Sequence, residues 1–160
     1  MNIMVVSDDH GRPGFDRFYK EAKSKYGKID YVIHAGDTDG NDNSYYEANA
    51  DCEVLFVRGN NDFNSNPSEI VKEIGGKKIF VTHGHRYGVY MGIQTLYYAG
   101  LERGADIIIY GHTHKANHQE GAGVHVLNPG SLTGVRSGQA TYAMLTINND
   151  DIKVEFNYGT

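Results

Sequence analysis

The sequence predicts an α/β fold in which short buried strands alternate with amphipathic helices. Apolar runs of three or four residues, rich in β-branched side chains, recur along the first two thirds of the chain. Stripes of apolar residues at helical spacing separate several of these runs, which is typical of βαβ units. The chain has 160 residues. This length lies within the roughly 50–250 residues of one compact domain, so we expect a single domain over residues 1–160.

Five strands are predicted in this part of the chain. The runs are too short for helices, and their β-branched content favours an extended backbone. The predicted strands are Ile3–Val6, Tyr31–Ile33, Val54–Val57, Ile79–Val81 and Ile107–Tyr110.

A helix is predicted over Pro13–Tyr26, because apolar side chains recur there at helical spacing. Pro13 stands near its start and Gly27 just past its end, which are the positions that proline and glycine favour. Similar stripes predict a second helix over Ile93–Leu101 and a third over Ser44–Ala50.

The remaining segments predict antiparallel structure. Gly75-Gly76 separates two short runs within residues 69–82 and is typical of a hairpin turn. After Gly111 the pattern indicates only strands, separated by Gly-rich or Asn-Asp turns. We expect these strands to form a second, antiparallel region appended to the first; they are Val124–Leu127, Ala140–Ile147 and Ile152–Phe156.

Composition excludes several classes of protein. The chain carries 15 Lys and Arg against 20 Asp and Glu, a net charge of −5, which argues against binding to long nucleic acids. No apolar run approaches the ~18 residues of a membrane span, and the first residues lack the pattern of a signal peptide. A single cysteine, Cys52, can form neither an internal disulfide nor a thiolate metal cage. We therefore expect a cytoplasmic protein.

Each of the five predicted strands ends in polar residues that could bind a metal ion. Ligands of open α/β sheets gather at the carboxyl ends of the strands, so these side chains converge if the strands share one sheet edge. Any one of them alone would be interpreted as a turn or helix-cap residue, but their coincidence at five strand ends favours one site. The converging set is Asp8, His10, Asp37, Asn60, His83, His112 and His114.

This donor set predicts two metal ions. It contains imidazole, carboxylate and amide groups but no sulfur, a composition that suits Mn, Fe, Ni or Zn. Seven protein ligands are too many for one catalytic metal that keeps positions open for water and substrate. Two ions about 3.5–4 Å apart need a bridging carboxylate, and can activate a hydroxide between them for in-line attack at phosphorus. Asp37, alone at the end of the second strand, is the predicted bridge.

The polar segments resemble the motif series of the calcineurin-like metallophosphoesterases. The matching motifs, in order, are Asp8-x-His10, Gly36-Asp37, Gly59-Asn60-x-Asp62, His83-Gly84-His85 and Gly111-His112-Thr113-His114. Three further segments are similar to the small YfcE-like phosphodiesterase branch of that family: Arg58-Gly59-Asn60-Asn61-Asp62, Thr82-His83-Gly84-His85 and Asn128-Pro129-Gly130-Ser131.

The resemblance implies a four-layer α/β/β/α sandwich of two mixed sheets that holds two divalent metal ions. By this likeness, Asp8, His10, Asp37 and His114 would hold the first ion. The second ion would be held by Asp37, Asn60, His83 and His112. Manganese is our first choice of metal, with Ni, Fe or Zn as alternatives.

The implied function is that of a metal-dependent phosphodiesterase, which hydrolyses small phosphodiesters by in-line attack of a metal-bridging hydroxide. Asp37, Asn60 and His112 are the expected catalytic residues. Many phosphatases of the family have a histidine where this chain has Asn61, and asparagine cannot usefully donate a proton near neutral pH. Good leaving groups should therefore be favoured. The YfcE-like branch also lacks that histidine, which favours a phosphodiesterase over the alternative of a phosphomonoesterase.

A non-catalytic scaffold, as in the retromer subunit that resembles this family, is the second alternative. Four of the chain's histidines are predicted metal ligands, which disfavours it. The expected partner is a small phosphoester, with neither long nucleic acid nor membrane, and assembly into homo-oligomers is compatible with the sequence.

Other polar and aromatic residues have narrower predictions. Asp62 is expected to brace a histidine or its own loop. His85 is expected to contact phosphate or orient a ligand, with a structural role in its loop as the alternative. His34 is expected in the core and Ser131 in a turn, whereas His118 and His125 are expected at the surface. Core packing is predicted for the tyrosines around the second helix, with a base-stacking wall or self-association face as alternatives; these are Tyr87, Tyr90, Tyr97 and Tyr98.

Overall fold

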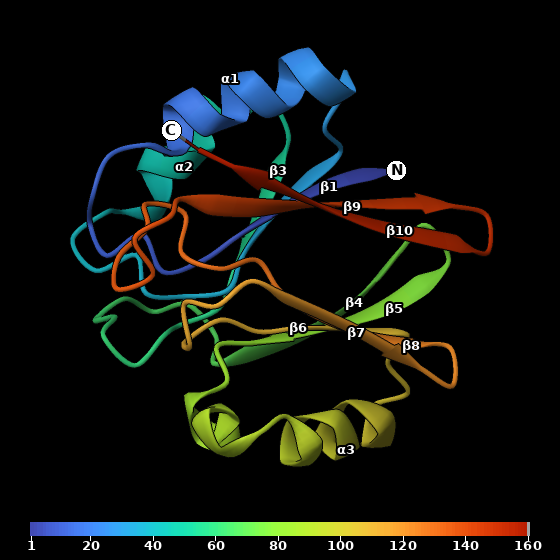
Figure 1. Cartoon of the computed structure of the whole chain (residues 1–160). Helices are drawn as coiled ribbons and strands as arrows, with labels where there is room; N and C mark the ends of the chain where they lie inside the picture. Colours follow the sequence, from blue (N-terminus) through green and yellow to red (C-terminus); the bar gives the residue numbers. More distant parts are fainter. Residues whose placement is uncertain (160) are drawn as a thin grey trace.

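Two five-stranded sheets pack face to face in the computed structural model, which describes residues 1–159 (Figure 1). The first sheet has the order β10-β9-β1-β2-β3, and the second has the order β4-β5-β6-β8-β7. The strands of the first sheet are β1 (Asn2–Val6), β2 (Tyr31–His34), β3 (Glu53–Phe56), β9 (Thr141–Asn148) and β10 (Asp151–Tyr158). Those of the second sheet are β4 (Glu69–Ile74), β5 (Lys77–Thr82), β6 (Ile107–Ile109), β7 (Asn117–Gly121) and β8 (Val124–Asn128).

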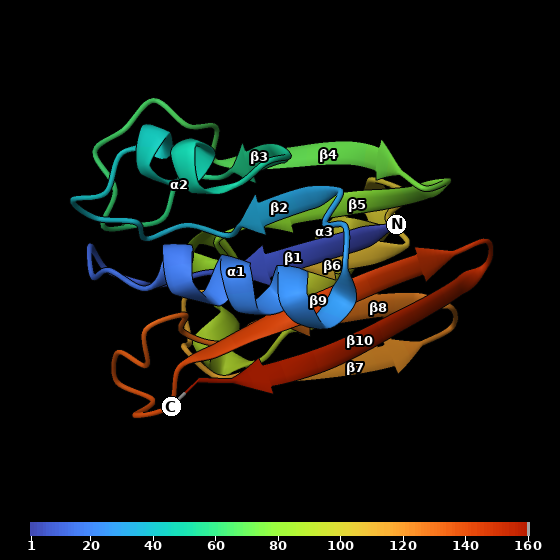
Figure 2. The same cartoon turned by 90° about the horizontal axis from the view of Figure 1, so that it is seen from above.

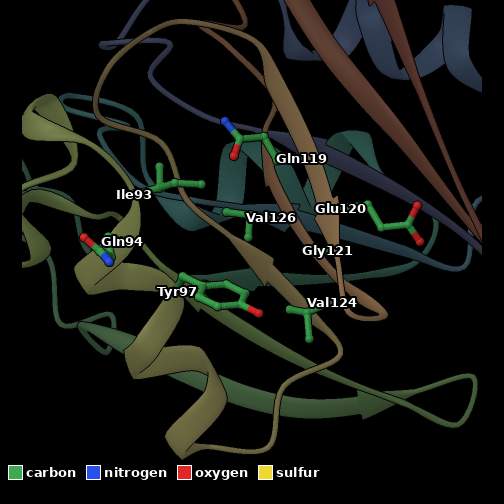
Figure 3. Close-up of a pocket in the computed structure, with 8 residues that line it drawn as sticks. All are labelled: Ile93, Gln94, Tyr97, Gln119, Glu120, Gly121, Val124 and Val126. Atoms are coloured by element: carbon green, nitrogen blue, oxygen red, sulfur yellow. The ribbon is translucent and has the colours of Figure 1, made fainter.

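Helices cover the outer face of each sheet. Helices α1 (Phe15–Tyr26) and α2 (Asn43–Asn49) lie on the first sheet, and α3 (Gln94–Glu102) lies on the second, beyond the 3-10 turns η1 (His85–Tyr87) and η2 (Val89–Met91) (Figure 1). Figure 3 shows side chains of the α3 region facing those of β7 and β8. The predicted four-layer α/β/β/α sandwich of two mixed sheets is confirmed.

The alternation of side chains along each strand produces three separate cores. On β1, Ile3 and Val5 face the second sheet, whereas Met4 and Val6 face α1. The central core between the sheets is built largely from Ile, Val and Leu, and α3 closes a third core over Phe80 and Ile108. Because both faces of these strands are buried, the sequence shows continuous apolar runs rather than alternation.

The five polar strand ends do not share one sheet edge, contrary to the expectation from sequence. Strands β1, β2 and β3 pair in parallel in the first sheet, while β5 and β6 pair in parallel in the second. Figure 2, which views the stacked sheets from above, shows the loops that follow β1 and β2 on the side opposite the N-terminus. The polar ends converge because the two sheets stack with the carboxyl ends of these strands on the same side.

The expectation of an appended antiparallel region was wrong. Strand β8 pairs in parallel with β6 in the second sheet, while β9 returns to pair antiparallel with β1 in the first sheet. The C-terminal strands therefore complete both sheets. Strand β7 was not predicted, because its five residues are mostly exposed and polar and lack the apolar pattern of a strand.

The histidines of the β7–β8 hairpin differ from the surface position expected of them. His125 is buried, and its ring stacks on that of His118 at 5.1 Å between centroids. His118 Nε2 lies 2.9 Å from His125 Nδ1, and Glu120 contacts the opposite side of the His125 ring. Position 125 faces the interior because β8 alternates and both of its faces are covered.

The tyrosines around α3 divide between core and surface. Tyr87 and Tyr97 pack against the third core, but Tyr90 and Tyr98 are 60% and 54% exposed, so core packing was a wrong prediction for these two. None of the helices within residues 1–159 has the length and the apolar character needed to cross a bilayer.

Candidate metal centre

The seven predicted metal-binding residues lie together at the carboxyl ends of the stacked strands. Asp8 and His10 follow β1, and Asp37 follows β2. The others follow β3, β5 and β6; they are Asn60, His83, His112 and His114. Three groups of donor atoms within 4.8 Å of one another form there, and two of them contain histidines: Asp8–His10–His114 and Asp37–His83–His112. The third, Asp37–Asp39–Asp62, shares Asp37 with the second.

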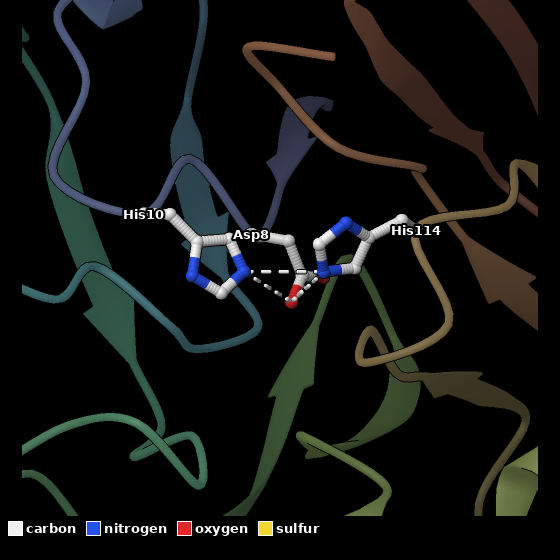
Figure 4. A group of neighbouring side chains, drawn as sticks. All are labelled: Asp8, His10 and His114. Atoms are coloured by element: carbon white, nitrogen blue, oxygen red, sulfur yellow. Dashed lines mark hydrogen bonds and ion pairs between the residues drawn. The ribbon is translucent and has the colours of Figure 1, made fainter. Parts of the chain in front are cut away.

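The first group joins the ends of β1 and β6. Figure 4 shows the rings of His10 and His114 facing each other beside the Asp8 carboxylate. The two Nε2 atoms lie 3.1 Å apart, and Asp8 Oδ1 lies 3.4 Å from His114 Nε2 and 3.9 Å from His10 Nε2. Such separations are those of donor atoms that surround a common point.

The second group joins the ends of β2, β5 and β6, and Asn60 from the end of β3 lies beside it. Asp37 Oδ2 lies 3.3 Å from His83 Nε2, which is also 3.3 Å from His112 Nδ1. Asn60 Oδ1 lies 3.0 Å from His112 Nδ1. Carboxylate, imidazole and amide donors therefore meet around this second point.

Asp37 lies between the two groups. Its Oδ2 atom is 3.3 Å from His83 Nε2 in the second group and 3.7 Å from His10 Nε2 in the first. Asn61 holds the carboxylate in place, because its backbone N–H donates to Oδ1 at 2.9 Å and its side-chain amide donates to Oδ2 at 3.0 Å. A carboxylate in this position can contact ions in both groups.

An unpaired buried oxygen indicates that the site accepts a cation. Asp8 Oδ1 is buried and has no hydrogen-bond partner within the part of the chain that the structure describes. Leaving a carboxylate oxygen unpaired is costly in a protein interior. Nε2 atoms of three histidines lie 3.4–3.9 Å from Oδ1, and a divalent cation beside Asp8, His10 and His114 would supply the partner that this oxygen lacks.

Three of the histidines have their second ring nitrogen occupied. Nδ1–H of His10 donates to Asp39 at 2.9 Å, that of His83 donates to the Ala35 carbonyl at 2.7 Å, and that of His114 donates to the Val135 carbonyl. Such partners fix the tautomer and aim Nε2 at a metal. Asp39 was not among the predicted site residues, and the only signal for it in the sequence is an acidic residue two positions after Asp37.

Charge and burial act against each other at this site. Burial by itself raises the pKa of Asp37, but the hydrogen bond and charge of His83 and the amide groups of Asn61 outweigh it, so the pKa lies well below its usual range. Burial lowers the pKa of His83, but Asp37 and Asp8 outweigh it and the pKa is raised. Carboxylates that stay ionised although buried need positive charge nearby, which a bound cation can provide.

The backbone at the site is held in an uncommon conformation. Six of its residues have positive φ, from 51° at His10 to 72° at His112; the others are Asp8, Asp37, Asp39 and His114. Asp and His tolerate this region better than most residues, yet each such position stores about 1–3 kcal/mol. The surrounding packing therefore maintains strain where the donors converge, as is common at functional sites.

Glycines let the backbone approach the donors closely. A Cβ atom at Gly59 would lie 2.1 Å from Asp37 Oδ1, and one at Gly111 would lie 2.7 Å from Asp8 Oδ2. A Cβ at Gly36 would lie 2.7 Å from His83 Nδ1. These three positions exclude any side chain, which explains the glycine that precedes three of the five polar motifs.

Asp62 ties the loops of the site together. Its carboxylate accepts hydrogen bonds from the backbone N–H groups of Asp37, Asp39 and Gly59, at 2.9, 3.0 and 2.8 Å. Both oxygens are used in this way, so Asp62 braces the loops after β2 and β3 and not a histidine.

His85 lies at the border of the second group. Its ring centroid is 5.5 Å from that of His83 and 6.0 Å from that of His112. Burial and the charge of His83 lower the pKa of His85. Its Nδ1 atom is buried and finds no hydrogen-bond partner among residues 1–159.

A buried layer supports the loop after β1. His34 lies in the core, as expected, where Nδ1 accepts from the Gly36 N–H and Nε2–H donates to Asp9 at 3.2 Å. Tyr46 of α2 donates to the other Asp9 oxygen. Ser131 accepts from the Val135 N–H and donates to the Asp8 carbonyl, so it fixes a turn as predicted. Asp9 was not predicted to have a role, because it occupies the unspecified middle position of the motif Asp8-x-His10.

Replacing Asp39 with asparagine should weaken metal binding about 10–100-fold, because His10 loses the carboxylate that orients it and increases its basicity. Asparagine tolerates the positive φ of 52° at this position, so the fold should be preserved. Titration calorimetry with Mn²⁺ measures the effect. Asp42→Asn is the control, because it removes the same charge at an exposed position three residues away. Equal affinities of the two variants for Mn²⁺ would contradict this role of Asp39.

Sequence comparison identifies relatives along nearly the whole chain. The profile of the calcineurin-like phosphoesterase superfamily domain matches residues 1–150. The probable metallophosphoesterase YsnB of Bacillus subtilis strain 168 is 35% identical over 158 residues, which cover 98% of this chain and 90% of that protein. Phosphodiesterase MJ0936 of Methanocaldococcus jannaschii is 30% identical over 165 residues, covering 91% of this chain and 92% of that protein.

Structural comparison identifies the same fold. The crystal structure of wild-type Vps29 from Entamoeba histolytica in complex with Zn²⁺ matches with a TM-score of 0.82 and 26% identity, covering 99% of this chain and 98% of that one. The matches to the family profile and to YsnB cover nearly the whole chain, and the two His/Asp donor groups lie within the matched residues. The chain belongs to the calcineurin-like phosphoesterase superfamily, in its branch of small YfcE-like phosphoesterases.

Proposed function

We propose that this protein is a metal-dependent phosphodiesterase that acts on small phosphodiesters. The observation that carries the proposal is the Asp37 carboxylate between two donor groups, within 3.3 Å of His83 Nε2 and 3.7 Å of His10 Nε2. Two-metal sites of this ligand chemistry suit displacement at phosphorus. Similarity to a phosphodiesterase at 30% identity supports the choice of substrate class.

Two divalent ions are the proposed cofactors. Asp8, His10, Asp37 and His114 would hold one ion, and Asp37, Asn60, His83 and His112 would hold the other. When bound, such ions supply an activated hydroxide and stabilise the negative charge that develops at phosphorus. Manganese remains our first choice, with Ni, Fe or Zn as alternatives, because the nitrogen and oxygen donors suit all four.

Asn60, His112 and His85 are the proposed contacts of the substrate. Asn60 is exposed and His112 is partly exposed, so both are accessible from solvent beside the second donor group. His85 has a lowered pKa and therefore stays neutral near pH 7. Nδ1 of this ring is buried, so Nε2 is the nitrogen through which a neutral His85 could donate to a phosphate oxygen or orient a ligand.

Asn61 limits the leaving groups that the site can expel. Its side-chain amide is committed to Asp37 Oδ2, and an amide offers no proton for a departing alkoxide near neutral pH. Phosphodiesters with good leaving groups, such as aryl esters, should therefore react fastest. We expect no binding of long nucleic acids, since the net charge is −5.

The test compares the diester and the monoester of one chromophore, bis(p-nitrophenyl) phosphate and p-nitrophenyl phosphate. Metal-depleted protein is reconstituted with Mn, Zn, Ni or Fe, its metal content is measured, and kcat/KM is determined for both esters. We expect two ions per chain and a diester preference of at least about tenfold, or 1.4 kcal/mol. A preference for the monoester would overturn the proposal in favour of a phosphomonoesterase. A fully loaded protein that is inert toward both would favour a scaffold.

A further inference from the structure

A groove leads from the candidate metal centre along α3. Its near part is a cavity of about 250 Å³ lined by residues of η2 and of the chain after β6, including Tyr90, Thr113, Lys115 and Asn117. Its far part is a cavity of about 410 Å³ between α3 and the β7–β8 hairpin (Figure 3). Ile93 and Gln119 line both cavities, so the two lie next to each other.

The near cavity adjoins the candidate metal ligands directly. Thr113 lies in the chain between His112 and His114. Tyr90 donates a hydrogen bond from its hydroxyl to the His112 carbonyl at 3.1 Å, and its ring centroid is 4.7 Å from that of His112. A phosphoester held by the metal centre therefore has this cavity next to it.

The near cavity combines apolar side chains, such as Val89 and Ile93, with polar groups and one positive charge. The ammonium group of Lys115 and the amides of Asn117 and Gln119 are exposed and line it together with the Tyr90 ring. Ammonium and amide donors suit oxygen atoms close to a phosphate.

The far cavity has a different chemistry. Ile93 and Tyr97 border it on the side of α3, and Val124 and Val126 of β8 form its floor (Figure 3). Its polar side chains, Gln94, Gln119 and Glu120, are exposed, and the Glu120 carboxylate lies 3.3 Å from His125 Nε2. An apolar wall of this size is typical of pockets that bind the hydrophobic part of a ligand.

We propose that this groove binds the organic group of an amphiphilic phosphodiester, with its polar atoms in the near cavity and an alkyl chain or apolar ring in the far cavity. The inference rests on the proposed function and specifies its substrate class. The cavity next to the metal centre carries ammonium and amide groups, and the cavity beyond it is lined mainly by apolar side chains. A ligand that matches this order has its phosphate at one end and its apolar part at the other.

Chain length of the substrate tests the proposal. Alkyl p-nitrophenyl phosphates from methyl to octyl share one leaving group, so only the alkyl part differs. We expect kcat/KM to rise with chain length, by up to about fourfold per methylene, until the apolar cavity is filled. If kcat/KM of an active enzyme did not change with chain length, the proposed role of the groove would be overturned. The proposed phosphodiesterase activity would not be affected.

Gly121→Trp tests the location. Gly121 lines the far cavity on the same face of β7 as Gln119, and a Cβ there meets no atom within 4 Å. Tryptophan should fill the cavity and lower the ratio of octyl to methyl kcat/KM at least about tenfold. Val71→Trp is the matched control and should not change this ratio. Val71 is 47% exposed on β4, and its pairing partner Phe80 packs in the core under α3.

Binding separates failure of the groove from failure of the proposed function. Calorimetry on the Mn-loaded protein compares octyl phosphate, below its micelle-forming concentration, with methyl phosphate. Tighter binding of octyl phosphate that Gly121→Trp removes would support the groove even if every diester were inert. Equal binding of the two phosphates would overturn it. So would dissociation of a dimer by Gly121→Trp in size-exclusion chromatography, because the apolar cavity would then be a contact between copies.

Discussion

Replacing Asp37 with asparagine should reduce kcat/KM for an aryl phosphodiester by about a thousandfold and remove at least one of the two metal ions. Asp37 Oδ2 is the atom that both donor groups approach, so a neutral amide there weakens both proposed ion sites. Loss of a bridging carboxylate removes several kcal/mol of charge stabilisation, which corresponds to this change in rate. Stopped-assay kinetics and elemental analysis of the same sample measure the two effects.

The fold should survive this substitution. Asparagine has the size of aspartate and tolerates the φ of 64° at position 37, and its side-chain oxygen can still accept a hydrogen bond from Asn61. Circular dichroism should therefore match that of the wild type. The Asp42→Asn variant controls for the change in net charge. A variant at position 37 that keeps two ions and full activity would refute the assignment of Asp37 as the bridge.

Replacing Gly59 with alanine should both destabilise the fold and weaken the metal centre. Its Cβ atom would lie 2.1 Å from Asp37 Oδ1 and 2.5 Å from the Asp37 backbone nitrogen. The backbone atom cannot retreat easily, since the Asp37 N–H is held by Asp62 at 2.9 Å. We expect the free energy of unfolding to fall by about 1–3 kcal/mol, and the affinity for Mn²⁺ to fall at least about tenfold as the carboxylate moves.

Gly40 provides the matched glycine for this experiment. A Cβ atom there meets no atom within 4 Å, and its φ lies outside the left-handed region, so Gly40→Ala should change stability by no more than about 0.5 kcal/mol. Chemical denaturation of both variants, with and without Mn²⁺, gives the two free energies. If Gly59→Ala behaved like Gly40→Ala, the close packing against Asp37 would have no energetic importance.

Much of the site was readable from the sequence because its motifs are local. Asp8-x-His10 and His112-x-His114 lie directly after apolar runs, and glycines next to the polar residues mark places where the backbone must come close. The helix boundaries were predicted within a few residues for the same reason, since amphipathic spacing is a local property of α1.

Contacts between distant segments were not readable in this way. The role of Asp39 depends on a hydrogen bond to His10, 29 residues away, and Asp39 has no motif of its own. The burial of His125 depends on both faces of β8 being covered, which a five-residue segment does not reveal. The groove along α3 depends on β7, a strand whose polar sequence carries no periodic signal.

The amino-acid pattern on its own was sufficient to predict the α/β elements and the polar residues that lie together at the site, because strand length, helical spacing and motif spacing are properties of short segments. The tertiary structure decided that the donors come from two stacked sheets, that Asp37 stands between the two groups, and that an apolar groove adjoins them. The physical reason is that strand pairing and sheet stacking depend on contacts between residues far apart along the chain, and these contacts leave no local pattern.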